Sequence, residues 1–174
     1  MAHNKSRGGK YPWSYIDFLP RMDLPPRERI QVWIDAARTL LDDPNVPNIS
    51  LTSEAEGNLH IQSLRSSDPS SPPSSPACTG LVLGFKVPAS FVNVSGSLSG
   101  AHASHLLDRA SFQLLCGAAK PGLWDKMAVS TSMNVFWRKP VFLGDEVTVE
   151  AEIESFAKST CSLDNAMMFP LLIF

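Results

Sequence analysis

The strongest pattern of hydrophobic and polar positions lies in the middle of the chain. Between Gly100 and Gly117, hydrophobic side chains recur at intervals of three and four residues: Ala103, Leu106, Leu107, Ala110 and Leu114. This spacing puts them on one face of an α-helix, and a glycine often follows the last turn of a helix. We therefore predict a buried helix that begins near Gly100 and ends near Gly117.

Strand-like patterns lie on both sides of this predicted helix. Before it, residues 81–87 are rich in β-forming side chains and end at Pro88. After it, apolar and polar residues alternate over 129–138 and again over 147–154, which is the two-residue period of a strand. Another strand begins at 160–163. Because the apolar positions of 147–154 share one face, we predict an antiparallel sheet that is covered on one side.

The N-terminal part of the chain has a different character. Apolar residues recur with helical spacing over 25–43, and prolines stand at both ends of this stretch. Residues 63–76 are rich in serine, contain four prolines and have almost no apolar side chains, so they cannot bury enough surface to become ordered. We predict three parts: an extension over 1–62 with a helix near 25–43, a flexible Ser/Pro-rich loop over 63–77, and a folded domain over 78–174.

Composition and charge limit the possible functions. The 174 residues allow one folded domain. Only 18% of them are charged, below the roughly 25% of typical soluble domains, so we expect part of the surface to pack against another chain. The net charge of -2 gives no basic field for nucleic acid. The apolar run 167–174 is far shorter than the roughly 20 residues of a membrane-spanning helix, so we expect no membrane span.

The three cysteines and the N-terminus bear on the compartment. The cysteines form no CxxC pair and no even-numbered framework, so reduced thiols inside the cell are expected. The first residues include Lys5, Arg7 and Lys10 but no apolar secretory segment. We expect a cytoplasmic protein, with a mitochondrial location as the alternative.

Two motifs with a fixed relative order carry a family resemblance. The first reads Asn93-Val-Ser-Gly96-Ser-Leu-Ser99-Gly100-Ala101 and is followed by Asp108. The second reads Asn134-Val-Phe-Trp137-Arg-Lys-Pro140-Val-Phe-Leu-Gly144-Asp145. Over residues 81–162, the sequence resembles the hotdog-fold acyl thioesterases of the phenylacetate-degradation and human thioesterase-superfamily type. It has Ser99 where that family has a histidine and Ala101 where it has a second glycine, and we expect one or two of the family's last strands to be missing or replaced.

The resemblance implies a fold and an activity. The fold is an α+β hotdog, in which a curved antiparallel sheet wraps a long central helix, here with an N-terminal helical extension. The activity is hydrolysis of an acyl-coenzyme A or of an acyl chain on a carrier protein. Family members are homodimers or homotetramers with the site at the interface, so Asp108 of one subunit would meet residues 93–100 of another. The resemblance requires no organic cofactor and no metal.

Four residues are candidates for the chemistry of thioester hydrolysis. Gly100 stands at the predicted helix N-terminus, where its N–H can polarise a carbonyl; the structural alternative is a tight turn. Asp108 is a carboxylate on a mostly apolar helix and is the candidate base; alternatively it pairs with Arg109 or His105. Asn93 would orient water or the carbonyl, or merely hold a turn. Ser130 would be a polar helper, or a surface hydroxyl.

Coenzyme A recognition and other chemistries have further candidates. Arg138 and Lys139 follow the second motif and could hold coenzyme A phosphates, although such residues often only solubilise a strand end. His102 or His105 could replace the family's histidine, or support hydration of an enoyl thioester. With Asp108 they make a poor metal site, because three ligands on successive turns of one helix cannot close around an ion. A non-catalytic acyl-binding or truncated hotdog protein is the main alternative function.

Overall fold

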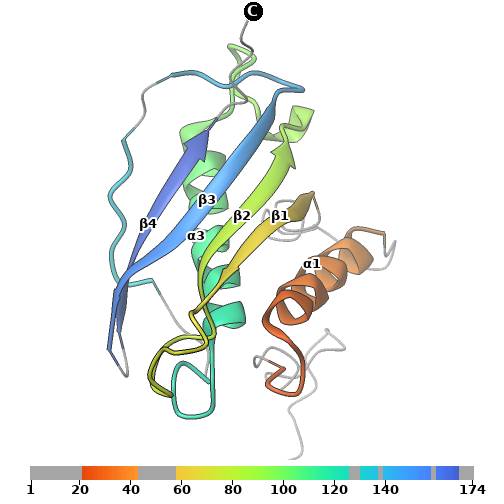
Figure 1. Ribbon diagram of the computed structural model, residues 1–174. Helices are drawn as coiled ribbons and strands as arrows, with labels where there is room; N and C mark the ends of the chain where they lie inside the picture. Colours follow the sequence, from red (N-terminus) through yellow and green to blue (C-terminus); the bar gives the residue numbers. More distant parts are fainter. Residues whose placement is uncertain (1–20, 43–57, 126–129, 137–138, 158–159, 169–174) are drawn as a thin grey trace, which may run out of the picture.

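The computed structural model describes residues 21–42, 58–125, 130–136, 139–157 and 160–168. Its helices and strands are α1 (Pro26–Asp42), β1 (Leu59–Ser66), β2 (Cys78–Lys86), the short 3-10 helix η2 (Ala89–Phe91), α3 (Gly100–Ala118), β3 (Glu146–Phe156) and β4 (Cys161–Met168). The strands form one antiparallel sheet in the order β1-β2-β3-β4. The long helix α3 crosses one face of this sheet (Figure 1). The predicted α+β hotdog fold is confirmed.

The alternation predicted for 147–154 is confirmed in β3. Val147, Val149, Ala151 and Ile153 are buried, and the residues between them are half-buried or exposed. Since successive side chains of a strand point to opposite faces, β3 turns one face towards α3 and the other towards solvent. The predicted helix and the strand at 81–87 are also present, as α3 and as most of β2.

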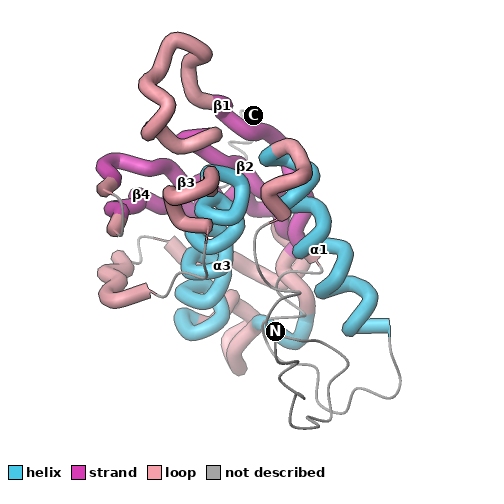
Figure 2. The backbone as a smooth tube through the Cα atoms, turned by 90° about the horizontal axis from the view of Figure 1, so that it is seen from below, coloured by secondary structure: helices cyan, strands magenta, loops and turns pink. Residues whose placement is uncertain are grey.

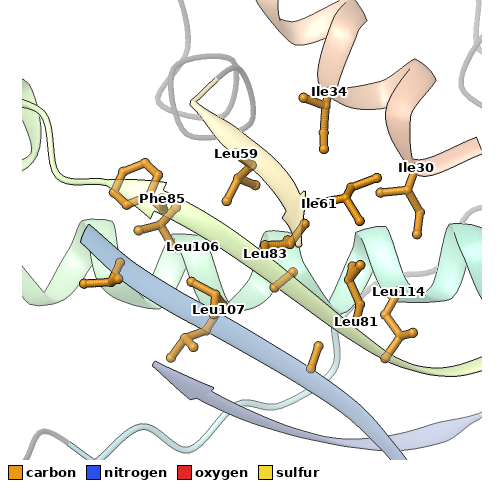
Figure 3. Packing of buried hydrophobic residues seen from close by; sticks show 14 of the residues in the cluster. Ile30, Ile34, Leu59, Ile61, Leu81, Leu83, Phe85, Leu106, Leu107 and Leu114 are labelled. Atoms are coloured by element: carbon orange, nitrogen blue, oxygen red, sulfur yellow. The ribbon is translucent and has the colours of Figure 1, made fainter. Parts of the chain in front are cut away.

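The core joins the sheet to both helices. Figure 3 shows side chains of β2, α3 and α1 in contact around the inner face of the sheet. Ile30 and Ile34 of α1 are fully buried there, and α1 lies beside α3 (Figure 2). Gly117 permits this approach, because an added Cβ would lie 2.8 Å from Ile30 Cδ1. The helix predicted near 25–43 is therefore present and is part of the same core.

Arginines of α1 attach it to the rest of the molecule. The guanidinium of Arg27 donates to the carbonyl oxygen of Ile61 at 3.0 Å, and that of Arg38 donates to Leu59 O at 2.8 Å. Arg29 is 8% exposed and donates to Ala119 O, just past the end of α3, at 2.7 Å. Burial lowers the pKa of Arg29, but an arginine remains charged in proteins.

Strand β1 was not predicted. It runs across the expected boundary between the extension and the Ser/Pro-rich loop, so residues 63–66 are strand and the connection to β2 is residues 67–77. The reason is that β1 is an edge strand whose second half is largely exposed. Its polar side chains face solvent while its backbone pairs with β2, so composition alone indicated a loop. The ends of the connection are joined by Ser67 N–H to Ala77 O at 3.2 Å.

The prediction of a strand over 129–138 is wrong for the residues that the structure describes. Residues 130–136 have no regular secondary structure, and residues 129, 137 and 138 lie outside the described ranges. Alternation predicts two faces, but a strand also needs a hydrogen-bonded neighbour, and the described sheet ends at β4. The segment passes on the β4 side of the sheet (Figure 1). Val135 still packs against the core.

The last strand is longer than the sequence indicated. The strand beginning at 160–163 continues to Met168: residues 164–166 and the first two residues of the apolar run 167–174 also pair with β3. Leu163 and Met167 pack against the core. This continuation of the strand was not predicted from the sequence, because Asp164 and Asn165 are polar. Asn165 occupies an inward position, where an alternating strand pattern leads one to expect an apolar residue.

Candidate functional site

The loop before α3 is built around Asn93. Its side-chain oxygen Oδ1 accepts hydrogen bonds from Ser95 N at 2.9 Å, from Ser97 N at 3.3 Å and from Ser97 Oγ at 3.2 Å. Gly96 has φ +75°, a conformation that favours glycine. Asn93 therefore holds the turn, which is the structural role that the sequence offered as the alternative to a catalytic one. A direct role for Asn93 in catalysis stays a prediction and would involve its Nδ2 amide group.

Ser99 and Gly100 form the start of α3. Ser99 is the N-cap, and its Oγ accepts a hydrogen bond from His102 N at 3.3 Å. Gly100 is the first helical residue and is exposed. The N–H groups of a first helical turn have no acceptor within the helix, and the helix dipole places partial positive charge there. This end of α3 is thus suited to a developing negative charge.

Asp108 and Ser130 are brought together. Asp108 lies in the middle of α3 and is half-buried. Ser130 comes from the segment after the helix, and its hydroxyl donates a hydrogen bond to Asp108 Oδ1. Two residues that were predicted separately are therefore in contact, which gives the carboxylate a fixed hydrogen-bond donor.

His105 is one turn before Asp108. Burial lowers the pKa of His105; the nearby Asp108 carboxylate opposes this effect, and His102 adds to it. The neutral imidazole is therefore favoured at His105. Arg109 follows Asp108 in the sequence and stacks on Phe112, with Cζ 4.5 Å from the ring centroid. Burial lowers the pKa of Arg109 to about 10.

Two further polar residues, Ser111 and Asn165, extend this site and were not predicted. Ser111 is one helical turn after Asp108, and its Oγ accepts a hydrogen bond from Asn165 Nδ2 of β4 at 2.7 Å. Asn165 Oδ1 is buried and has no hydrogen-bond partner among the described residues. The signal in the sequence was an asparagine in register with Leu163 and Met167, two positions that pack on the core. It was missed because residues 164–168 were not recognised as a strand.

Gly100 and Asp108 are separated on the same helix. They are eight residues apart in α3, which at 1.5 Å per residue is about 12 Å along the axis. A thioester carbonyl that accepts a hydrogen bond from Gly100 N–H cannot also be within reach of Asp108 of the same chain. The structure of one chain therefore brings Asp108 to Ser130 but not to Gly100 or Asn93.

The remaining expectations concern phosphates, metals and membranes. Lys139 is exposed, and Arg138 lies outside the described residues. Within the described ranges, no group of three or more His, Cys, Asp or Glu side chains is placed to hold a metal ion. Among the helices described, none combines the length and the apolar character needed to cross a membrane.

Comparisons with known proteins agree with this picture. Residues 95–167 match the family profile of the thioesterase superfamily. Among solved structures, zebrafish thioesterase superfamily member 2 is 15% identical with a TM-score of 0.58, and the match covers 80% of this chain and 86% of that chain. The PaaI protein from the phenylacetic acid degradation operon of E. coli is 19% identical with a TM-score of 0.54, over 82% and 83% of the two chains.

A third similar structure contains a ligand. The hypothetical thioesterase from Streptococcus pneumoniae, solved with coenzyme A, is 21% identical with a TM-score of 0.52, over 65% of this chain and 74% of that one. No curated protein sequence matches the chain. The resemblance predicted from the two motifs is confirmed: residues 95–167 have the sequence pattern of the thioesterase superfamily, and the described part of the chain has the hotdog fold of its members.

Proposed function

We propose that the protein hydrolyses acyl thioesters, releasing a carboxylic acid from an acyl-coenzyme A or from an acyl chain on a carrier protein. The observation that carries this proposal is the Asp108 carboxylate, half-buried in α3 and hydrogen-bonded to Ser130. The match of residues 95–167 to the thioesterase superfamily supports the class of reaction. The proposal also names two carriers for the acyl chain, coenzyme A and a carrier protein.

Asp108 would act on water or on the thioester itself. A carboxylate can deprotonate an attacking water or attack the carbonyl carbon directly. The hydroxyl of Ser130 keeps Oδ1 in one position, leaving the other carboxylate oxygen for the reaction. The negative charge that develops on the carbonyl oxygen would be stabilised by Gly100 N–H at the start of α3, where donors are already oriented. No organic cofactor and no metal takes part in this scheme.

The separation of Gly100 and Asp108 favours a site made from two copies of the chain. About 12 Å lie between them along α3, so the two functions can meet on one thioester only if residues 93–100 come from one copy and Asp108 from the other. We therefore propose a homodimer, or a homotetramer built from such dimers. The low share of charged residues, 18%, supports a surface buried between copies.

The phosphates of coenzyme A would bind to Arg138 and Lys139. Lys139 is exposed, as a residue that meets a soluble ligand must be, and basic side chains form strong charge-assisted hydrogen bonds to phosphate. The similar thioesterase from S. pneumoniae was solved with coenzyme A, which supports this choice of ligand. We place the enzyme in the cytoplasm, with the mitochondrion as the alternative.

The test is release of free thiol from short, medium, aromatic and long acyl-coenzyme A substrates. Wild type is compared with Asp108→Asn and with Asp164→Asn, a matched change at an exposed acid of β4. We expect turnover to fall by about 100-fold or more in Asp108→Asn and to be unchanged in Asp164→Asn. Equal activity of Asp108→Asn and wild type would refute the carboxylate mechanism.

A non-catalytic acyl-binding function is the second candidate. Ser99 in place of the family's histidine is the observation that favours it. In that case the folded oligomer would bind an acyl-coenzyme A, measured by calorimetry, and would release no thiol from any substrate of the panel.

A further inference from the structure

The turn that leads into α3 holds a serine and a histidine in direct contact. Ser99 Oγ and His102 Nδ1 are 2.6 Å apart. The same Oγ accepts a hydrogen bond from the backbone N–H of His102. When the imidazole proton is on Nε2, this contact lets the Ser99 hydroxyl donate its proton to Nδ1. A serine hydroxyl within hydrogen-bond distance of an imidazole nitrogen is the arrangement of a nucleophile with its base.

The ring of His102 is held in place by Phe91. The two rings are stacked, with centroids 4.4 Å apart and planes 29° from parallel, and Phe91 is fully buried. His102 Nε2 is itself buried and has no hydrogen-bond partner among the described residues. The ring is therefore fixed by packing with Nδ1 towards Ser99, and the aromatic face of Phe91 favours the cation that forms when His102 takes up a proton.

Donors for the carbonyl oxygen stand next to this pair. Ser99 is half-buried, and Gly100, which follows it, is exposed. The N–H of Gly100 belongs to the first turn of α3, so it has no acceptor within the helix. In α/β-hydrolases, too, the nucleophilic serine precedes a helix, and the backbone N–H of the next residue contributes to the oxyanion hole. Nucleophile, base and oxyanion donor thus lie within four consecutive residues of one chain.

We propose that Ser99 is a nucleophile that accepts the acyl group, with His102 as its general base; the choice of a thioester as substrate rests on the proposed function. Ser99 Oγ forms a bond to the thioester carbon, and its proton passes to His102 Nδ1. The carbon–sulfur bond breaks, and the thiolate leaves as a thiol with the proton from His102. Water then hydrolyses the Ser99 ester, giving the carboxylic acid and free Ser99. Asp108 of a second copy would deprotonate that water.

The experiment looks for the acyl group on Ser99 in the full chain. Protein is mixed with the acyl-coenzyme A panel or with p-nitrophenyl acetate, quenched in acid after short times, and analysed by intact mass and peptide mapping. Ser99→Asn removes the nucleophile but keeps a good N-cap, so equal thermal unfolding of this variant separates chemistry from folding. His102→Gln keeps a hydrogen-bonding side chain without a base. Ser74→Ala, at an exposed serine of the connection between β1 and β2, is the control.

We expect an adduct on Ser99 in wild type and in Ser74→Ala, and none in Ser99→Asn. Its rate of formation should fall by about 100-fold or more in His102→Gln, the usual contribution of a general base. Absence of an adduct with both probes, together with wild-type thiol release by Ser99→Asn, would overturn the proposal and leave the Asp108 mechanism standing. Acetylation of Ser99 by p-nitrophenyl acetate without thiol release from any thioester would uphold the nucleophile and refute the proposed function.

Discussion

The hydroxyl of Ser130 donates a hydrogen bond to the carboxylate of Asp108, linking the middle of α3 to a segment without regular secondary structure. Neither residue belongs to a strand of the described sheet. The position of the carboxylate therefore depends on a contact between two side chains. If Asp108 is the base, removing the hydroxyl should weaken catalysis without removing the base.

Ser130→Ala should accordingly lower kcat by about 10-fold, the worth of roughly one hydrogen bond to a charged group. Ser130→Thr keeps the hydroxyl and should retain most of the activity. KM should change little in both, because Ser130 orients the carboxylate rather than holding the substrate. The measurement is steady-state thiol release, with Ser132→Ala, at an exposed serine two residues later, as control. A kcat of Ser130→Ala equal to that of the control would show that the contact has no catalytic role.

A site shared between two copies predicts complementation between inactive variants. Gly100→Pro removes one N–H at the first helical position, where proline is compatible with a helix, and Ser99, with ψ 144°, suits a residue before proline. Mixed with Asp108→Asn and allowed to exchange subunits, it should form dimers with one intact site. Random exchange of equal amounts would restore about a quarter of the wild-type activity, given a twofold-symmetric dimer.

The control for this experiment is Gly100→Ala, which adds a side chain but keeps the N–H. Its activity shows how much of the loss in Gly100→Pro is due to the missing donor. If Gly100→Pro and Asp108→Asn regain nothing together, although native mass spectrometry shows mixed dimers, the two groups do not serve one site across the interface.

Patterns along the chain predicted the parts of the fold that are amphipathic on their own. The helix at 100–117 and the strand at 147–154 each bury one regular face, so periodicity revealed them. The edge strand β1 and the end of β4 were missed because polar residues such as Ser63 and Asn165 occupy them, and hydrogen bonds to a neighbouring strand do not show in the sequence. The prediction of a strand at 130–136 failed for the opposite reason. Apolar and polar residues alternate there, but the segment has no hydrogen-bonded neighbour in the described sheet.

The candidate site was predictable to a similar degree. The spacing of the motif that resembles the thioesterase family marked Asp108 and Gly100 as candidates, and the structure places the Ser130 hydroxyl in contact with Asp108. The contact between Ser99 and His102 required the geometry of the helix start, because a serine at an N-cap is common and its partner three residues later was one of two histidines. Asn165 could not be assigned to the site before its strand was known.

Buried thiols predict a fall in stability at alkaline pH. Burial raises the pKa of the Cys78 and Cys116 thiols to about 12. Above about pH 9 the unfolded chain loses these protons while the folded chain keeps them, so unfolding becomes more favourable as pH rises towards 12. Each thiol should lower the free energy of unfolding by about 1.4 kcal/mol per pH unit in this window.

Urea denaturation between pH 8 and pH 10.5 measures this dependence. The double variant Cys78→Ala/Cys116→Ala should be less stable at pH 8 because it loses packing, but its stability should decline less steeply above pH 9. Comparing the two slopes cancels the titration of other groups. Parallel slopes would mean that these thiols ionise equally in the folded and unfolded chains.

The hydrogen bonds of the Arg29 guanidinium predict that α1 stabilises the C-terminal end of α3, which is remote from the proposed chemistry. It donates to Leu24 O at 2.6 Å and to Ala119 O at 2.7 Å, and a cation is favourable beside the C-terminal carbonyls of a helix. Arg29→Met keeps an apolar chain but removes the donor to the part-buried Leu24 oxygen and to the buried Ala119 oxygen, which should cost about 2–3 kcal/mol of unfolding free energy. Arg21→Met, at an exposed ion pair with Asp23, should cost much less, because surface ion pairs contribute little to stability. Hydrogen exchange should show faster opening of α1 in Arg29→Met alone, and equal stability of the two variants would refute this role, since the lost contact would then be worth no more than a surface pair.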